Sequence, residues 1–154
     1  MKRILVGVDA SPPSVEALRR AVEEARARDA KLEVVYVFAP PEQVTAWPVP
    51  PDMGEDQPDV EGERKKAEER LGKWLEEIDV DLSGIDVDWT VIADRRPSRA
   101  LVERSADADL IVVGSRGRGG FAGLRLGSVS EQVTRHAHCP VLVVRTKAKE
   151  QTKT

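Results

Sequence analysis

Residues 114–130, GSRGRGGFAGLRLGSVS, combine glycine, arginine and serine in a pattern suited to binding an anion. Six glycines fall within 14 residues, and glycine allows positive φ and close backbone approach, so successive N–H groups can point at one anion. The run ends in Gly127-Ser128-Val129-Ser130, which opens a predicted helix whose free N–H groups favour phosphate, with the serine hydroxyls as further donors. Residues 110–138 hold four arginines and one acid in a chain of net charge -3. We predict an anion site here, the alternative being a glycine-rich turn with solvated arginines.

Two well-known phosphate loops are absent from the sequence. No Gly-x-x-x-x-Gly-Lys-Ser/Thr segment occurs, because the single Gly-Lys pair belongs to GKW at 72–74. A dinucleotide fingerprint would follow the first strand, but GVDAS at 7–11 contains one glycine. P-loop hydrolysis and nicotinamide redox chemistry are therefore disfavoured. Asp9 is left as a candidate ligand at the end of that strand, or as a residue that only caps the turn.

The elements that must position these residues can be predicted from periodicity. Five short apolar runs, rich in valine and isoleucine, are typical of buried strands in a parallel sheet: Ile4–Val8, Leu32–Phe38, Val87–Ile92, Leu110–Gly114 and Val141–Val144. Helical spacing alternates with them, after Ser11 with prolines in the first turn, over Val60–Ile78, from near Pro97 and after Gly127. The alternation predicts an α/β fold, an open, doubly wound five-stranded parallel sheet with helices on both faces.

Length and composition indicate one soluble globular domain. The chain has 154 residues, of which 40% are hydrophobic and 33% charged, which suits one core and argues against disorder. We expect the domain to span residues 1–146, with a proline-rich loop at 40–59 and a polar tail at 147–154. The charge gives no indication of a nucleic-acid or membrane partner, and no apolar run suits a membrane span or a signal peptide. We therefore expect a cytoplasmic protein.

The remaining candidates have plainer explanations. His136, His138 and Cys139 could suggest a metal site, but histidines two residues apart near a helix end point in different directions, so packing is the expected role and no side-chain metal site is predicted. Trp74 and Trp89 are expected in the core or on a sheet face rather than as base-stacking platforms.

The spacing G-x2-G-x9-G-S over residues 114–128 resembles the nucleotide-binding signature of the universal stress protein family. The segment ILVGVDAS at 4–11 is similar to that family's first strand and its aspartate. DLIVVGSRG at 109–117 and HCPVLVVR at 138–145 are similar to its fourth and last strands. The resemblance covers about residues 1–146, with the motifs in the family's order.

The resemblance implies a fold of the adenine nucleotide α-hydrolase type, commonly a homodimer, with ATP bound at the carboxyl ends of the strands. The family's site residues carry over to eleven positions of this chain. Asp9, with Gly7 and Val8, would lie by the ribose and adenine, and the backbone of Val37 would read the adenine edge. Gly114, Arg116 and Gly117 would wrap the ribose and phosphates, while Gly127, Ser128, Val129 and Ser130 would hold the phosphates together with Mg²⁺ or Mn²⁺.

The chain departs from the family pattern at 94–97, DRRP, where a small residue such as glycine is expected. The two arginines either alter the rim of the pocket or are solvated.

The function that the resemblance implies is ATP binding by a regulatory or stress-response protein, with at most slow hydrolysis because no general base can be named. The alternatives are an interaction module of the same fold that does not use nucleotide, and a genuine ATPase. Alanine at Gly114 or Gly127 is expected to weaken ATP binding through steric block and loss of positive φ. In the family's strand order, Val141–Val144 is an apolar edge strand, so we expect a symmetric homodimer through it.

Overall fold

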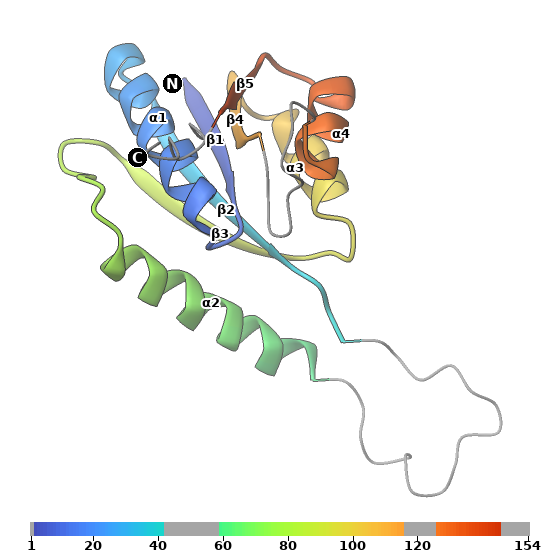
Figure 1. Cartoon of the computed structure of the whole chain (residues 1–154). Helices are drawn as coiled ribbons and strands as arrows, with labels where there is room; N and C mark the ends of the chain where they lie inside the picture. The colour runs from blue at the N-terminus through green and yellow to red at the C-terminus, as the bar shows by residue number, and fades with distance from the viewer. Residues whose placement is uncertain (1, 42–58, 116–125, 146–154) are drawn as a thin grey trace, which may run out of the picture.

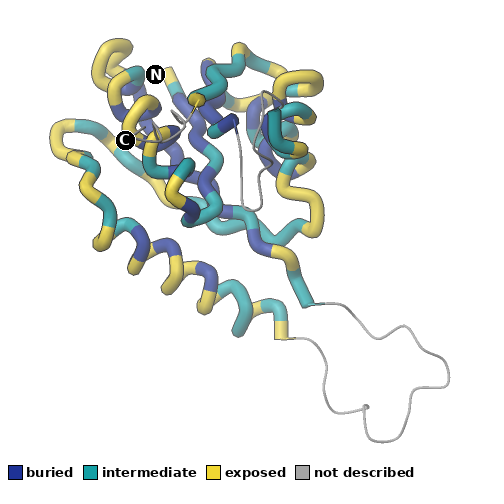
Figure 2. Tube along the Cα trace, in the orientation of Figure 1, coloured by how far each residue is buried: buried dark blue, intermediate teal, exposed yellow. Residues whose placement is uncertain are grey.

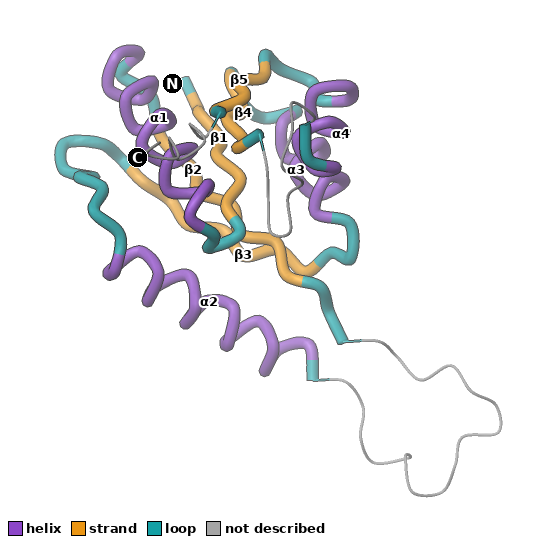
Figure 3. Tube along the Cα trace, in the orientation of Figure 1, coloured by secondary structure: helices purple, strands orange, loops and turns teal. Residues whose placement is uncertain are grey.

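The computed structural model describes residues 2–41, 59–115 and 126–145, in which strands and helices alternate (Figure 1, Figure 3). The strands are β1 (Arg3–Val8), β2 (Lys31–Phe38), β3 (Val87–Ala93), β4 (Leu110–Gly114) and β5 (Val141–Val144). The helices are α1 (Pro12–Arg28), α2 (Val60–Glu77), α3 (Pro97–Ser105) and α4 (Ser128–His136). The predicted elements are confirmed. Most of the predicted 40–59 loop and the 147–154 tail lie outside the described residues.

The strands form one parallel sheet in the order β3-β2-β1-β4-β5, which confirms the predicted doubly wound fold. In the centre of the sheet, Val6 of β1 lies opposite Val34 of β2 on one side and Val112 of β4 on the other. β1 is therefore buried between two neighbours, and β3 and β5 form the edges. No helix in the described part of the chain is long and apolar enough to cross a membrane.

Helices cover both faces of the sheet, and each pair encloses its own layer of core (Figure 1, Figure 2). Alternate strand residues point to opposite faces. The layer under α1 and α2 contains Val6, Val34 and Leu18, and the layer under α3 and α4 contains Leu5, Val35 and Ile111. Near-continuous apolar runs are what strands buried on both faces require.

The two tryptophans of the described elements differ in burial. Trp74 of α2 is 9% exposed and packs in the first layer, as predicted. Trp89 of β3 is 41% exposed, so it does not lie in the core, and the sheet-face alternative of the expectation remains, because Trp89 pairs with Val34 within the sheet. Its exposure reflects its place on an edge strand, where no further strand shields the side chain.

Gly7 lets α3 approach the sheet closely. A Cβ atom built on Gly7 would lie 2.9 Å from Cδ1 of Leu101 and 3.1 Å from its Cδ2, whereas carbon atoms in contact sit about 3.5–4.0 Å apart. Leu101 of α3 is 3% exposed and belongs to the second core layer. The missing side chain therefore has a packing explanation, independent of any ligand.

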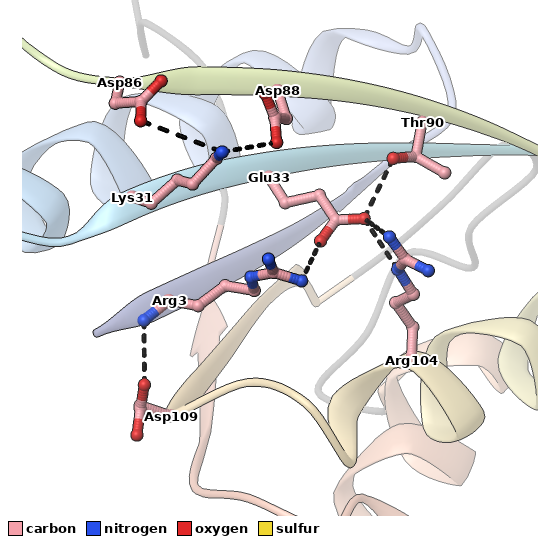
Figure 4. Close-up of polar contacts among 8 residues, drawn as sticks. All are labelled: Arg3, Lys31, Glu33, Asp86, Asp88, Thr90, Arg104 and Asp109. Atoms are coloured by element: carbon pink, nitrogen blue, oxygen red, sulfur yellow. Dashed lines mark hydrogen bonds and ion pairs between the residues drawn. The ribbon is translucent and has the colours of Figure 1, made fainter. Parts of the chain in front are cut away.

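A polar network centred on Glu33 holds α3 against the sheet (Figure 4). Glu33 of β2 is 3% exposed, and its carboxylate accepts hydrogen bonds from Nε of Arg104 at 2.7 Å and from the hydroxyl of Thr90 at 2.9 Å. Nη1 of Arg3 in β1 lies 3.4 Å from the other carboxylate oxygen of Glu33, Oε2. A buried charge is tolerated only when it is paired and hydrogen-bonded, so this network ties α3 to three strands.

Candidate functional site

The carboxyl ends of β1 and β4 form the topological switch point of the sheet. The two strands are neighbours, but β1 continues into α1 on one face and the helix after β4 packs on the other. Ligands of doubly wound sheets bind outside the strand ends at such a point. Among the described residues that the sequence singled out, Val37 lies near the carboxyl end of β2. The others lie at the ends of β1 and β4 or at the start of α4: Gly7, Val8, Asp9, Gly114, Gly127, Ser128, Val129 and Ser130. Arg116 and Gly117 lie outside the described residues.

The carboxylate of Asp9 organises the turn between β1 and α1. Its Oδ1 accepts hydrogen bonds from the N–H of Ser11 at 3.0 Å, from the Ser14 hydroxyl at 2.6 Å and from the Ser11 hydroxyl. Ser11 thus occupies the N-cap position as predicted, but its hydroxyl serves Asp9 instead of the helix. Ala10 has a φ of 61°, a left-handed conformation that costs a residue with a Cβ about 1 kcal/mol. The turn-capping role of Asp9 is therefore observed, and its ligand role stays a prediction.

Val37 presents a backbone acceptor at the same edge. The N–H and C=O groups of successive strand residues point to alternate sides, and the N–H of Lys31 bonds to Lys2 on the β1 side at 2.9 Å. Val37 is six residues later and therefore also faces β1, but the register between the two strands ends at Val8 opposite Tyr36. The Val37 carbonyl consequently lies beyond its ladder, where the predicted adenine contact would need it.

The amino terminus of α4 supplies backbone donors. Gly127 is the N-cap residue, and no side chain caps the helix in the described part of the chain. The first bond of the helical ladder runs from the Glu131 N–H to the Gly127 carbonyl at 2.9 Å. The N–H groups of Ser128, Val129 and Ser130 therefore lie outside that ladder. Together with the positive end of the helix dipole, they form the kind of site that binds a phosphate.

The conformation of the site glycines differs from the expectation. Gly127 has φ −64° and ψ 162°, an extended conformation that any residue can adopt. Among the glycines that the structure describes, Gly84 alone has a positive φ. The expectation that alanine at Gly114 or Gly127 would act through loss of positive φ is therefore wrong. What stays a prediction is close approach of a ligand to the backbone.

Ser130 fastens the two ends of the glycine-rich segment. Its hydroxyl donates to the Gly127 carbonyl at 2.9 Å and to the Ser115 carbonyl at 3.1 Å, and the side chain is buried. The Gly127 N–H also bonds to the Ser115 carbonyl, at 2.7 Å. The Ser130 hydroxyl is thus engaged inside the protein, so its backbone N–H is the group directed beyond the helix. The Ser128 side chain is exposed.

A turn after β3 forms the rim beside β2. The Asp94 N–H bonds to the Phe38 carbonyl at 3.0 Å, which joins the turn to the end of β2. Arg99 donates to both carboxylate oxygens of Asp94, at 2.7 and 3.0 Å. This pairing with Arg99 holds the pKa of Asp94 below its usual range and raises that of Arg99. Sequence reasoning noted the arginines at 95 and 96 but missed Arg99, because its spacing from Asp94 matches no simple motif.

The two histidines are exposed, so the packing role expected for them is not observed. The backbone N–H of His138 donates to the Ser105 hydroxyl at 3.0 Å. Cys139 packs against the second core layer, and burial raises the pKa of its thiol. Within residues 2–41, 59–115 and 126–145, no three histidine, cysteine or acidic residues come together as a metal site.

A hollow of about 230 Å³ lies at the other end of the sheet, where α1 ends and β2 begins. Arg26, Asp29, Lys31 and Asp86 are among its lining residues. It contains none of the residues that the sequence singled out, and the amino ends of the strands are not where doubly wound sheets bind ligands.

Comparison with known proteins gives consistent results. The sequence model of the universal stress protein family matches residues 1–145. Universal stress protein Rv2623 of Mycobacterium tuberculosis is 38% identical over 143 residues, which cover 92% of this chain and 44% of that protein. The chain spans about half the length of the curated relatives it matches.

Solved structures share the fold. A universal stress protein in complex with cAMP is 28% identical, with a TM-score of 0.57 and coverage of 95% of this chain and 98% of that one. The universal stress protein from Archaeoglobus fulgidus in complex with dAMP is 24% identical, with a TM-score of 0.54 and coverage of 93% and 97%.

Proposed function

The chain belongs to the universal stress protein family, and on that premise we propose that it binds an adenine nucleotide, with ATP as the expected ligand, and acts as a nucleotide-dependent regulatory protein. The observation that carries the proposal is the uncapped start of α4 at the switch point of the sheet. It offers backbone donors to an anion close to where β1 and β4 end.

The strand order suggests how the nucleotide lies. The phosphates would accept hydrogen bonds from the first N–H groups of α4, and Arg116 and Gly117 are proposed to add to this cradle. The ribose would lie beside Asp9 at the end of β1. The adenine amino group would donate to the Val37 carbonyl at the end of β2. Mg²⁺ or Mn²⁺ would be bound through phosphate oxygens, as magnesium commonly is.

The relatives support this choice of ligand. One structural neighbour was solved with cAMP and another with dAMP. Both ligands combine an adenine base with a phosphate, which is the combination that the Val37 carbonyl and the α4 terminus would recognise. ATP shares both groups and adds two phosphates for the donors of α4.

Regulation is proposed in preference to turnover. We assign no general base, because Asp9 is proposed near the ribose and its Oδ1 is already engaged in the turn. Bound nucleotide would instead shift the populations of the surfaces that partners see.

A second candidate function, an interaction module that uses no nucleotide, is favoured by one observation. The Ser130 hydroxyl finds its acceptors within the protein, so the edge is held together without a ligand. Mass spectrometry of gently purified protein separates the two functions. Copurified adenine nucleotide supports the first, and protein free of nucleotide supports the second.

We also propose that two copies pair through β5. Ile111 of β4 and Ser115, the residue after β4, donate N–H groups to the carbonyls of Pro140 and Val144, so by alternation the N–H of Val143 points away from β4. Val143→Pro removes that outward donor and is expected to convert a dimer into a monomer in sedimentation experiments, whereas Val143→Ala keeps the donor and the dimer. A monomeric wild-type protein at micromolar concentration would refute the pairing.

The test of nucleotide binding uses Ser128, the first residue of α4. Proline fits this position, because the first helical N–H has no ladder partner and the extended Gly127 suits a following proline. Ser128→Pro removes one donor, and a charge-assisted hydrogen bond is worth roughly 1.5–3 kcal/mol, so ATP affinity should fall about tenfold or more. Ser128→Ala, the matched control, removes only the hydroxyl.

Calorimetric titration of ATP into the wild type, Ser128→Pro and Ser128→Ala measures the three affinities. No binding to the wild type at millimolar ATP would refute the proposed function. Binding that Ser128→Pro leaves unchanged would refute its location at α4.

A further inference from the structure

We propose that Arg96 is a specificity-determining residue, whose guanidinium contacts the base of the bound nucleotide and favours purines over pyrimidines. This inference rests on the proposed nucleotide binding and deepens it. Arg96 is one of the two arginines that stand where a small residue was expected.

The strand order gives Arg96 its place. Along the carboxyl edge, the ends of β3, β2, β1 and β4 follow one another. The proposed contacts to base, ribose and phosphates lie at β2, β1 and β4 respectively. The turn after β3 is therefore the next structure outward from the base. Figure 1 shows the connection from β3 to α3 leaving the sheet at the edge where β2 also ends.

Hydrogen bonds fix the backbone of Arg96 in that turn. Its N–H donates to Oδ1 of Asp94 at 2.9 Å, and its carbonyl accepts from the N–H groups of Arg99 and Ala100 at 3.0 and 3.3 Å. Asp94 is joined in turn to Phe38, the residue after Val37. The Cα of Arg96 is thus held at a set position relative to the proposed base contact.

The side chain of Arg96 is available for a ligand. It is exposed, and none of the described residues hydrogen-bonds to its guanidinium. The nearby carboxylate of Asp94 is hydrogen-bonded by Arg99 at both oxygens, and the charge of Arg96 adds only an electrostatic attraction to it. The planar face of Arg96 and its N–H donors therefore stay available for a ligand.

Distances decide which part of the nucleotide Arg96 can contact. Neighbouring strands lie about 4.8 Å apart, so β3 is roughly 14 Å from β4 and about 5 Å from β2. An extended arginine side chain reaches roughly 7 Å from its Cα. Arg96 can thus reach a base at the end of β2 but not phosphates at the start of α4. A guanidinium stacks on the face of a base and donates to ring nitrogens. A purine has a larger ring face and more ring nitrogens than a pyrimidine.

The test compares wild type with Arg96→Ala, Arg96→Lys and a matched control, Arg70→Ala, an exposed arginine of α2. The titrated ligands are ATP, CTP and inorganic triphosphate. Arg96→Ala should weaken ATP binding about tenfold, the loss of one stacking partner. It should weaken CTP binding less and leave triphosphate binding unchanged. Arg96→Lys, which keeps the charge but not the planar group, should also lose ATP affinity. Arg70→Ala should match wild type.

The outcomes separate this inference from the proposed function. Equal losses for ATP and triphosphate would show that Arg96 acts only through its charge and would overturn the inference. ATP binding insensitive to Arg96→Ala would overturn it as well, and leave the proposed function standing. A wild type that binds neither ATP nor triphosphate would overturn both. Circular dichroism of each variant checks that the fold is retained.

Discussion

Replacing Gly7 by alanine tests whether this glycine serves packing. The new Cβ would lie 2.9 Å from Cδ1 of Leu101, at least about 0.6 Å inside normal carbon contact. Leu101 is 3% exposed, so its side chain has little room to move. Forcing a methyl group into a filled core costs about 1–3 kcal/mol.

Two smaller effects oppose this cost. Alanine restricts the unfolded chain more than glycine, which stabilises the native state by about 0.4–1 kcal/mol, and the buried methyl contributes about 0.8 kcal/mol. We therefore expect Gly7→Ala to lower the free energy of unfolding by about 0.5 kcal/mol, the difference between the centres of these ranges. With an m-value of about 2 kcal/mol/M, the urea midpoint should fall by about 0.25 M.

Leu101→Val provides the decisive comparison, because it removes the two atoms that the new Cβ would strike. In a double-mutant cycle the two substitutions should be coupled by about 1 kcal/mol, with the double variant more stable than additivity predicts. Gly72→Ala is the matched control. Its Cβ would meet nothing within 4 Å on α2, so it should stabilise the protein by about 0.8–1 kcal/mol. Additive effects of Gly7→Ala and Leu101→Val would refute the packing explanation.

Three further predictions follow from the polar contacts. Glu33→Gln should lower the free energy of unfolding in urea by about 2 kcal/mol, because it removes a buried charged acceptor. Glu76→Gln, at an exposed position of α2, is the control and should change that free energy by less than about 0.5 kcal/mol. Similar effects of the two substitutions would contradict the role of the network. Arg99 lowers the pKa of Asp94, so the stabilisation is present above the unfolded pKa of about 4 and is lost as pH falls through the folded pKa. The stability difference between wild type and Asp94→Asn should thus shrink from pH 7 to pH 2.5, and a constant difference would argue against it. Burial raises the pKa of Cys139, so iodoacetamide at pH 7.5 should alkylate it at least about tenfold more slowly in folded than in urea-unfolded protein, and equal rates would contradict this.

The sequence predicted the scaffold well because its signals are local. Strands buried on both faces must be continuously apolar, and the run Leu110–Gly114 matches β4 residue for residue. The start of α1 was visible in Pro12 and Pro13, which suit a first helical turn. The doubly wound arrangement then followed from the alternation of elements and the right-handed crossover.

The site was predicted in part, for the same reason. The donors at the start of α4 could be expected from Gly127 and Ser128, because a helix start is a local feature. The φ of Gly127 could not, since composition says which conformations are allowed but not which one is adopted. The inward bond of the Ser130 hydroxyl also escaped prediction, because it depends on Ser115 coming within reach.

Contacts between distant parts of the chain were missed altogether. Arg104 lies 71 residues from Glu33, and no spacing rule connects them. No spacing rule connects Leu101 with Gly7 either. The resemblance to the family indicated a ligand contact for this glycine and gave no sign of its packing role. A glycine in a strand often marks close approach of another group, and only the register of α3 on the sheet shows that this group is a leucine.

The proposed site would bind the nucleotide through backbone groups at α4 and Val37 and through a side chain at Arg96. The donors at α4 and the acceptor at Val37 belong to the backbone, so substitutions that preserve the fold leave them in place. Arg96 acts through its side chain, which a single substitution can remove while the turn, held by Asp94 and Arg99, keeps its hydrogen bonds. Affinity for a phosphate would then follow from the fold, and the preference among bases from the residue at the rim. A variant at position 96 that altered phosphate affinity without altering base preference would contradict this division.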